Sequence, residues 1–416
     1  MIRRLEVLVI AAFLIVAAFS TGLAFLFYLV YLGVLVVGGS YVLTRLGLAD
    51  LEAGYAVNQL HGHVGDQLRV TYTLRNASRL PKPWLEIHNP TTLPGGLPGR
   101  ALTLGSRAER SWLVRAPLVR RGHFRIEPLQ IATGDPFGLF EASASVGQPV
   151  TLVVYPRLEP IPLWKLPPAS IEGSRAAPER TLQTTPLATS VRPYAPGDAM
   201  NRIHWKTTAR HGEIQVKEFD LEQTADAWIF LDLDRSVAEG EGDESSVETA
   251  VRAAAAIADK AIAENRAVGL TTNGHRAGIL PADRGSRQHL KIMQLLAAVE
   301  ADGTTPLSES LLAGLGRVRR GMTAVVITSS LARDWVRPLA TLRARGVACV
   351  VIWLDAAAFE QHGATARARP TDAAQAEPAA QEAARRARAL RHALAEYDLP
   401  VKVVTPGRPL AEVLVG

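Results

Sequence analysis

The chain has 416 residues, enough for two or three domains of ordinary size. Its single cysteine, Cys349, excludes an internal disulfide framework and a cysteine-based zinc cluster. The formal net charge is +6, but the basic residues are not clustered with aromatic residues as in a nucleic-acid reader. We therefore expect no nucleic-acid partner. We expect Cys349, inside the apolar run Val347–Leu354, to be a buried strand thiol.

An apolar stretch without charged residues runs from Val7 to Leu43, too long for one membrane helix of about 20 residues. A turn is expected near its middle, at residues 20–22, so residues 1–48 are predicted to form a transmembrane helical hairpin. Basic residues flank both ends of the stretch and none lies in the turn: Arg3, Arg4 and Arg45. The positive-inside rule then predicts a multi-pass protein of the inner (cytoplasmic) membrane with cytoplasmic soluble domains.

Two other interpretations of the N-terminus remain open. Residues 1–20 have the charge and apolar core of a cleaved signal peptide, although the apolar run continues past any cleavage site. A single long, tilted helix would instead place the soluble domains outside, as an extracytoplasmic cell-envelope binding protein.

Residues 49–160 show short segments of alternating apolar and polar residues, separated by glycine and proline. This pattern predicts an all-β sandwich of immunoglobulin-like size, although the Cys–Trp–Cys signature is missing. The expected strands are 68–74, 84–87, 111–115, 122–126, 129–133 and 150–155. Residues 161–190, rich in proline, alanine, serine and threonine, are predicted to be an exposed linker.

Residues 191–226 contain the densest run of unusual residues in the chain. Asp198 is expected to cap a helix over residues 200–209, and residues 215–219 are expected to form a strand. The prominent side chains of this region are Arg192, Tyr194, Gly197, Asp198, Arg202, His204, Trp205, Lys206 and Arg210.

This pattern, Arg-x-Tyr-x-x-Gly-Asp followed by Ile-His-Trp-Lys and Ala-Arg, resembles the signature of the bacterial family called domain of unknown function 58. The earlier stretches Arg120–Gly122, Gly134–Phe140 and Tyr155–Arg157 are also similar to that family. The resemblance implies a C-terminal von Willebrand factor A-like domain. Family members are typically encoded beside MoxR-type AAA+ ATPases and other von Willebrand A proteins. The resemblance thus implies a non-enzymatic, membrane-tethered adaptor with those partners.

Two interpretations of the signature are open. In one, Arg202, Lys206 and Arg210 form a basic ladder that binds an acidic partner such as the ATPase. In the other, Trp205 and Ile203 pack between domains while Asp198 and the arginines pair internally.

Residues 227–416 alternate between apolar strands and helices, which predicts a parallel, doubly wound α/β sheet. The expected strands are 228–233, 268–272, 323–328, 347–354 and 401–404, with a further edge strand at 277–280. Residues 356–380 are expected to be a flexible insertion.

The segment Asp232-Leu233-Asp234-Arg235-Ser236 follows the first of these strands and resembles the metal-site loop of von Willebrand A domains. Oxygen donors at alternate positions suit Mg²⁺, so Asp232, Asp234, Ser236 and Thr304 are candidate ligands of a degenerate site. The late aspartate of such sites is missing, because the later loop reads Thr328-Ser329-Ser330. The alternative is a loop that keeps the fold without the ion.

A rival functional class is an Mg²⁺-dependent hydrolase that uses Asp232 and Asp234, with His204 as base. No nucleophile motif supports it, so we expect no enzymatic activity.

Overall fold

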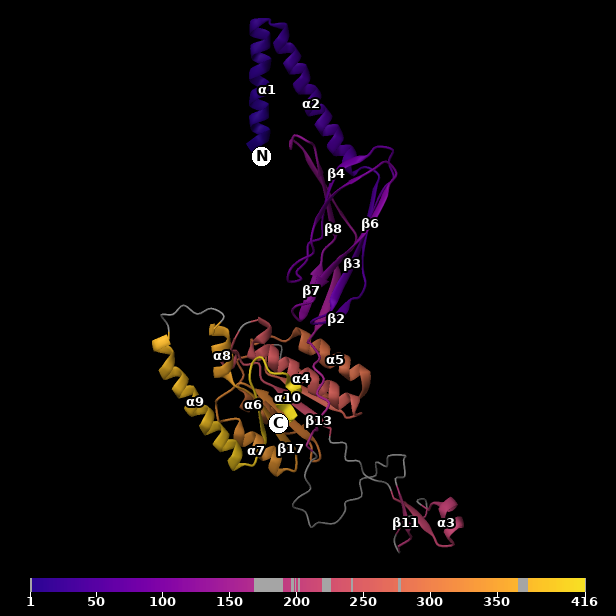
Figure 1. Cartoon of the computed structure of the whole chain (residues 1–416), viewed down its shortest axis with the longest axis vertical. Helices are drawn as coiled ribbons and strands as arrows, with labels where there is room; N and C mark the ends of the chain where they lie inside the picture. The colour runs from indigo at the N-terminus through magenta and orange to yellow at the C-terminus, as the bar shows by residue number, and fades with distance from the viewer. Residues whose placement is uncertain are drawn as a thin grey trace. The chain divides into compact units, whose positions relative to one another are not determined.

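The structure is a computed structural model that describes residues 2–167, 190–195, 198, 200, 203–218, 226–240, 242–275, 278–365 and 373–415. It contains two compact units (Figure 1). The first comprises Met1–Arg157 with Met293–Ala298, and the second comprises Leu158–Ile292 with Val299–Gly416.

The chain begins with two helices, α1 (Ile2–Thr21) and α2 (Ala24–Leu48), which reverse direction at Gly22 with φ of +68°. The rings of Phe19 and Phe27 meet edge to face at 5.3 Å across the hairpin. The structure thus contains two helices joined by a turn at the expected position. In the described part of the chain, only α2 is long and apolar enough to cross a membrane, whereas α1 contributes the shorter apolar stretch Val9–Thr21. A multi-pass topology is therefore not supported.

A buried lysine joins the end of α2 to the β-rich part of the same unit. Lys82, at the start of β4 (Lys82–His88), donates hydrogen bonds to the carbonyl oxygens of Leu46 and Ala49, the latter at 2.8 Å. The last carbonyls of a helix have no partner within the helix, so the ammonium satisfies them. Burial lowers the pKa of Lys82, against the opposing effect of Asp50.

Ten strands, six of them predicted, complete this unit around one apolar core. They form three sheets, ordered β1-β3-β6, β5-β4-β8-β9 and β2-β10-β7. The side chains of β3 alternate strictly between core and solvent, which is why the period-two pattern revealed it. The remaining strands are β1 (Leu51–Val57), β2 (His61–His63), β3 (Gln67–Asn76), β5 (Arg100–Leu104), β6 (Glu109–Pro117), β7 (Gly122–Ile126), β8 (Leu129–Gly134), β9 (Glu141–Val146) and β10 (Val150–Tyr155).

The second unit opens with a segment that we expected to be exposed linker. Instead, Ile161, Trp164 and Leu166 are buried. Polar contacts also hold this segment in its unit, since Lys260 donates to the Pro162 carbonyl oxygen at 2.9 Å. The linker prediction was therefore wrong for residues 161–167, because apolar residues between the prolines pack inward. Residues 168–189 lie outside the described part of the chain.

The second unit is built on a six-stranded sheet of order β15-β14-β13-β16-β17-β18 (Figure 1). Its strands are parallel except at one edge, where β15 runs antiparallel to β14. The sheet is therefore mixed rather than fully parallel, because a connection too short for a crossover joins these two strands. The strands are β13 (Ala227–Leu231), β14 (Val268–Thr272), β15 (Ile279–Asp283), β16 (Thr323–Thr328), β17 (Ala348–Leu354) and β18 (Val401–Val404).

Helices cover the sheet, and the central strands are buried throughout. One apolar cluster joins Trp228 and Phe230 of β13 to residues of α6, α7 and α9. Cys349 is buried on β17, as predicted. The helices of this unit are α4 (Ser246–Ala263), α5 (Gly285–Ala298), α6 (Leu307–Gly314), α7 (Val336–Ala344), α8 (Ala356–Thr365), α9 (Ala373–Glu396) and α10 (Leu410–Val415).

The expected flexible insertion at residues 356–380 differs from the structure, in which α8 and the first turns of α9 occupy most of it. The alanine-rich sequence explains the difference, since alanine has the highest helix propensity of all residues. Residues 366–372 lie outside the described part of the chain.

The substitution Lys82→Met tests the junction between α2 and the sheet. It keeps the length of the side chain but leaves the carbonyl oxygens of Leu46 and Ala49 without their donor. We expect the opening free energy of peptides from the end of α2 and from β4 to fall by about 1–3 kcal/mol in hydrogen exchange. Lys291→Met, on the exposed side of α5, is the control and should change nothing. Equal protection in both variants would contradict this role of Lys82.

Candidate functional site

The carboxyl ends of β13, β14 and β16 bring together three polar side chains: Asp232, Asn273 and Thr328. β13 lies between β14 and β16, so the chain winds away from it in both directions. In open α/β sheets such a switch point is the usual place for a ligand. This edge of the sheet is therefore the first candidate site.

The Asp232 carboxylate accepts a hydrogen bond on each of its oxygens. The Thr328 hydroxyl donates to Oδ2 at 2.6 Å, and the Asn273 amide Nδ2 donates to Oδ1 at 2.7 Å. The backbone N–H of Asp234 donates to Oδ1 as well, at 3.2 Å. The side-chain amide oxygen Oδ1 of Asn273 in turn accepts from the N–H of Leu233 at 2.5 Å. The network thus ties the loop after β13 to both neighbouring strands.

Burial governs the titration of Asp232. Desolvation raises the pKa of this carboxyl above its ordinary value, although the bonds from Thr328, Asn273 and the Asp234 N–H act in the opposite direction. A carboxyl with a raised pKa inside a parallel sheet fits either a functional site or a structural network.

The structure places the other predicted metal ligands on two adjoining loops. Asp234 caps the short helix η2 (Arg235–Val237) by accepting the Ser236 N–H at 2.8 Å, and the Ser236 side chain is exposed. Thr304 follows Gly303, which pairs with Asp234. A Cβ on Gly303 would lie 2.3 Å from the Asn273 carbonyl oxygen, so only glycine permits this approach.

These residues do not fit a magnesium ion. The groups nearest the Asp232 carboxylate are three hydrogen-bond donors, which face it with protons where a cation would need oxygen lone pairs. Within the described ranges, no group of three or more His, Cys, Asp or Glu side chains is arranged to hold a metal ion. The arrangement instead resembles a buried polar network with its bonds satisfied.

The sequence analysis missed Asn273 and Thr328 as partners of Asp232. Their positions at strand ends could have revealed them, because Asn273 directly follows β14 and Thr328 ends β16. Residues at the carboxyl ends of neighbouring parallel strands meet at one edge of the sheet.

The signature region forms a small module over residues 190–218. β11 (Ser190–Pro193) pairs antiparallel with β12 (Gln215–Glu218), and α3 (Trp205–His211) lies between them in sequence. Ile203 bridges to Val216, and both side chains are buried in the module. Gly197 and Arg202 lie outside the described residues.

Arg192 and Asp198 hold the module together from within. Two parallel hydrogen bonds of 2.8 Å join the guanidinium to the carboxylate. Asp198 also accepts the N–H of Ala195 at 2.9 Å and so closes a turn. The predicted helix over residues 200–209 was therefore wrong in its bounds. His204 caps α3 instead, because its ring Nδ1 accepts the Thr207 N–H at 3.2 Å.

The remaining signature side chains face solvent in this module. Trp205 is 67% exposed, and Lys206, Arg210 and Tyr194 are also exposed. No hydrogen bond or ion pair between described residues joins His204 to Asp232 or Asp234. The structure thus brings together the carboxyl-edge residues, and separately the signature residues, but does not join the two sets.

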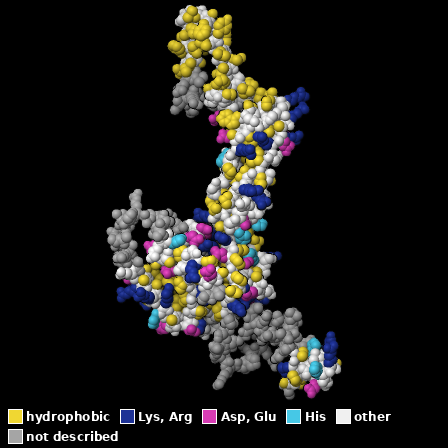
Figure 2. Space-filling model, in the orientation of Figure 1, with side chains coloured by type: hydrophobic (Ala, Val, Ile, Leu, Met, Phe, Trp, Pro, Cys, Tyr) yellow, Lys and Arg dark blue, Asp and Glu magenta, His cyan; other side chains and the backbone are white. Residues whose placement is uncertain are grey.

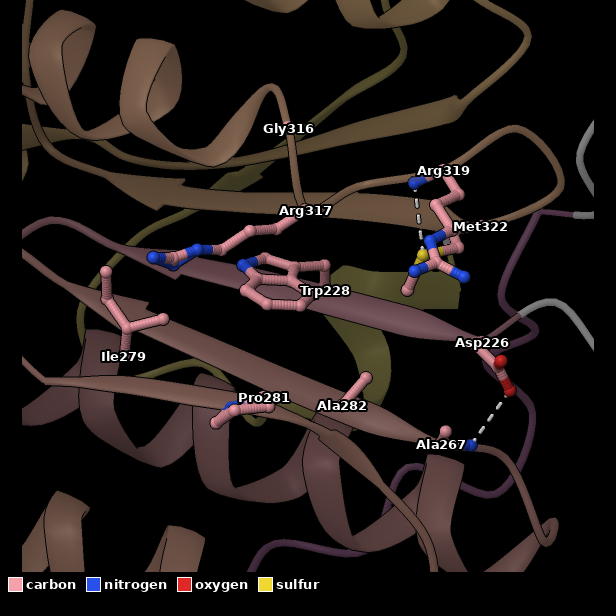
Figure 3. A pocket seen from close by; sticks show the side chains of 10 residues that line it. All are labelled: Asp226, Trp228, Ala267, Ile279, Pro281, Ala282, Gly316, Arg317, Arg319 and Met322. Atoms are coloured by element: carbon pink, nitrogen blue, oxygen red, sulfur yellow. Dashed lines mark hydrogen bonds between the residues drawn. The ribbon is translucent and has the colours of Figure 1, made fainter.

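A pocket of about 570 Å³ lies at the opposite, amino end of the strands (Figure 3). Trp228 and Ile279 line it, together with Met322, Arg317 and Arg319. Asp226 at its rim accepts the N–H of Ala267 at 3.0 Å. Its lining contains no acid–base or nucleophile pair.

Thr323, next to this pocket, makes hydrogen bonds to the backbone on both sides of the segment that contains the module. Its hydroxyl donates to the Pro167 carbonyl oxygen at 2.9 Å, and its N–H donates to the Asp226 carbonyl oxygen at 2.8 Å. Pro167 and Asp226, which flank residues 168–225 in the chain, are thus both held by one residue of β16.

Residues 190–394 match the model of the family described as "Protein of unknown function DUF58". Over this segment the chain is therefore similar to that family, as the signature residues had indicated. The matched segment includes both the module and the carboxyl-edge network.

The chain is similar to the uncharacterized protein YeaD of Bacillus subtilis, with 28% identity over 70% of this chain and 74% of that protein. An uncharacterized protein of Mycobacterium tuberculosis is 30% identical over 39% of this chain and 53% of its own length. Among solved structures, the CARDB domain of a Pyrococcus furiosus protein matches with a TM-score of 0.19 and 12% identity, over 25% of this chain and 92% of that one. A mussel byssus matrix protein reaches 0.26 and 13%, over 31% and 38%. Scores this low assign no fold.

Substitutions at Asp232 test whether the network is structural. Asp232→Ala leaves the Asn273 amide and the Thr328 hydroxyl buried without their acceptor. We expect it to lower the opening free energy of β13 and β16, measured by hydrogen exchange, by about 2–4 kcal/mol. Asp232→Asn keeps the size and one acceptor, so it should cost less.

The pH dependence separates the two variants further. A raised pKa means that the native state holds the Asp232 proton to higher pH than the unfolded state. Stability then falls as pH rises from the ordinary carboxyl pKa to the raised one, and levels off above it. Asp232→Asn should lack this decline. The same decline in the variant would show that Asp232 does not cause it.

Magnesium provides a second test of the same loop. Because the donors around Asp232 oppose a cation, millimolar Mg²⁺ should give no calorimetric binding signal with the full-length chain in detergent. A signal that Asp232→Ala abolishes would restore the metal site.

Proposed function

We propose that the chain is a membrane-tethered adaptor in which α2 inserts into the inner membrane and the module of residues 190–218 recruits a partner protein. The proposal rests on a difference between two sets of signature side chains in the module. Arg192 and Asp198 are paired internally, whereas Trp205, Lys206 and Arg210 face solvent on α3.

An exposed tryptophan beside two basic residues has the chemistry of a protein-binding surface. Tryptophan and arginine are enriched among the residues that dominate binding energy in interfaces. Moreover, a two-stranded hairpin is marginally stable by itself, so the module gains from contact with another surface. The basic residues favour an acidic partner. The family resemblance suggests a MoxR-type AAA+ ATPase, with other von Willebrand A proteins in the same assembly.

We place the soluble domains in the cytoplasm, since Arg45 follows the apolar stretch and Arg3 and Arg4 precede it. This placement needs α1 to span the membrane as well. Only the apolar stretch Val9–Thr21 of α1 would then lie in the hydrocarbon core, with Arg3 and Arg4 at its cytoplasmic surface.

At the level of fold, we propose that the second unit is of the von Willebrand A type and that the β-rich part is immunoglobulin-like. The central position of β13 and the acidic loop at its carboxyl end support the former. The antiparallel sheets around one apolar core support the latter. The hydrolase is not favoured, since His204, the base that it would use, serves as the N-cap of α3.

Charge reversal on α3 tests the adaptor. The double substitution Lys206→Glu and Arg210→Glu should weaken binding of the purified MoxR-type ATPase by tenfold or more, about 1.4 kcal/mol, in a surface-immobilised binding assay. Trp205→Ala should weaken binding at least as much, because it removes the largest exposed side chain of the helix.

The matched control reverses two exposed arginines elsewhere, Arg337 and Arg385, and should leave binding unchanged. If both pairs weaken binding equally, only the net charge of the chain matters. If neither pair nor Trp205→Ala has an effect, the module is not the docking surface.

A further inference from the structure

The end of the β-rich part that adjoins α2 exposes large apolar side chains. Phe137 is 60% exposed, Leu80 52% and Trp84 49%. Figure 2 shows hydrophobic side chains continuing from the helical hairpin onto this end of the unit. Isolated exposed apolar residues are ordinary on protein surfaces, but these three belong to segments that flank the junction with α2.

All three come from segments that contact the last turns of α2. Leu80 and Trp84 flank Lys82, whose ammonium holds the Leu46 and Ala49 carbonyl oxygens. Trp84 is also linked to Thr133, which donates to its carbonyl oxygen at 2.7 Å. Thr133 packs so closely on α2 that a Cβ on Gly47 would lie 2.7 Å from its methyl group.

The loop of residues 134–140, which carries Phe137, is held rigidly against α2. The Asp135 carboxylate is buried and accepts the N–H groups of Phe137 at 2.8 Å and Phe140 at 2.6 Å. Burial alone would raise the pKa of Asp135, but these backbone bonds hold it below its ordinary value. The Phe140 ring meets the Tyr41 ring of α2 edge to face at 5.7 Å.

The depth of this loop follows from the length of α2. A hydrocarbon core about 30 Å thick takes up about 20 helical residues. Counted from Ala24, the first residue of α2, the core ends near Leu43, just before Arg45. Tyr41 therefore lies at the boundary of the core, and the loop that packs on Tyr41 lies at the same level.

We propose that this end of the unit is a lipid-contact surface, in which Phe137, Leu80 and Trp84 lie in the headgroup region of the leaflet that α2 enters. Aromatic side chains are favoured at that level of a bilayer. The exposed Arg45 and Arg79 beside them suit anionic headgroups. The inference rests on the proposed insertion of α2 and adds that the β-rich part is itself seated on the membrane.

Single cysteines make the proposal measurable in the full-length chain. The native Cys349 is buried and its pKa is raised to about 12, chiefly by burial, so a maleimide fluorophore should not label it. The labelled variants are Phe137→Cys and Leu80→Cys, with Leu60→Cys as a matched control. Leu60 is 57% exposed and precedes β2, away from the segments that contact α2.

The chain is reconstituted in vesicles of phosphatidylcholine and phosphatidylglycerol that contain lipids with a nitroxide near the headgroup. We expect the labels at positions 137 and 80 to be quenched at least about twofold more than the label at position 60. Equal quenching at all three positions would overturn the lipid-contact surface and leave the patch to a protein partner.

A fourth variant separates this inference from the tether on which it rests. Leu35→Cys lies on the exposed side of α2 and should be quenched by nitroxides near the middle of the acyl chain. If position 35 is quenched and positions 137 and 80 behave like position 60, the tether holds and the surface does not. If position 35 is not quenched, the insertion of α2 itself fails.

Discussion

The α/β domain depends on the hydrogen bonds that one buried carboxylate, that of Asp232, accepts. Asp232 lies where three parallel strands end, and an ionised carboxylate buried there without donors would be strongly unfavourable. Donors from β14 and β16 converge on it: the Asn273 amide and the Thr328 hydroxyl. These bonds hold the central strand in register with both neighbours, and they also use the oxygens that a cation would need.

Two features of the surrounding loops follow from that network. The side-chain Oδ1 of Asn273 accepts the Leu233 N–H, and its Nδ2 donates to Asp232 and to the Thr305 carbonyl oxygen. This arrangement brings the loop of residues 303–305 so close that Gly303 cannot carry a Cβ. Hydrogen bonds within the domain thus engage the polar groups of Asp232 and Asn273 at this edge of the sheet.

Regular periodicity made most of the fold predictable from the sequence. The apolar runs that became β13, β16 and β17 and the alternation that became β3 were identified because each is long or strongly patterned. Short strands such as β2, with three residues, carry too little pattern to be recognised. The candidate metal loop shows a different limit of sequence reasoning. Sequence spacing located the loop, but hydrogen-bond direction depends on residues from two other strands.

The signature region shows the same limit of local reasoning. Asp198 was expected to cap a helix over residues 200–209; in the structure its carboxylate forms two hydrogen bonds with the Arg192 guanidinium. The helix α3 begins later than expected, at Trp205, and His204 is its N-cap. The side chains that α3 exposes from this start include Trp205, Lys206 and Arg210.

Covalent geometry adds a constraint on where the module can act. Seven residues, 219–225, connect Glu218 of β12 to Asp226. At no more than about 3.6 Å per residue, they allow a separation of roughly 25–30 Å at most. Asp226 is fixed by Thr323 at the amino end of the sheet, beside the pocket lined by Trp228. A partner bound to α3, as proposed, would therefore be held near that end of the domain and not near the edge that carries Asp232.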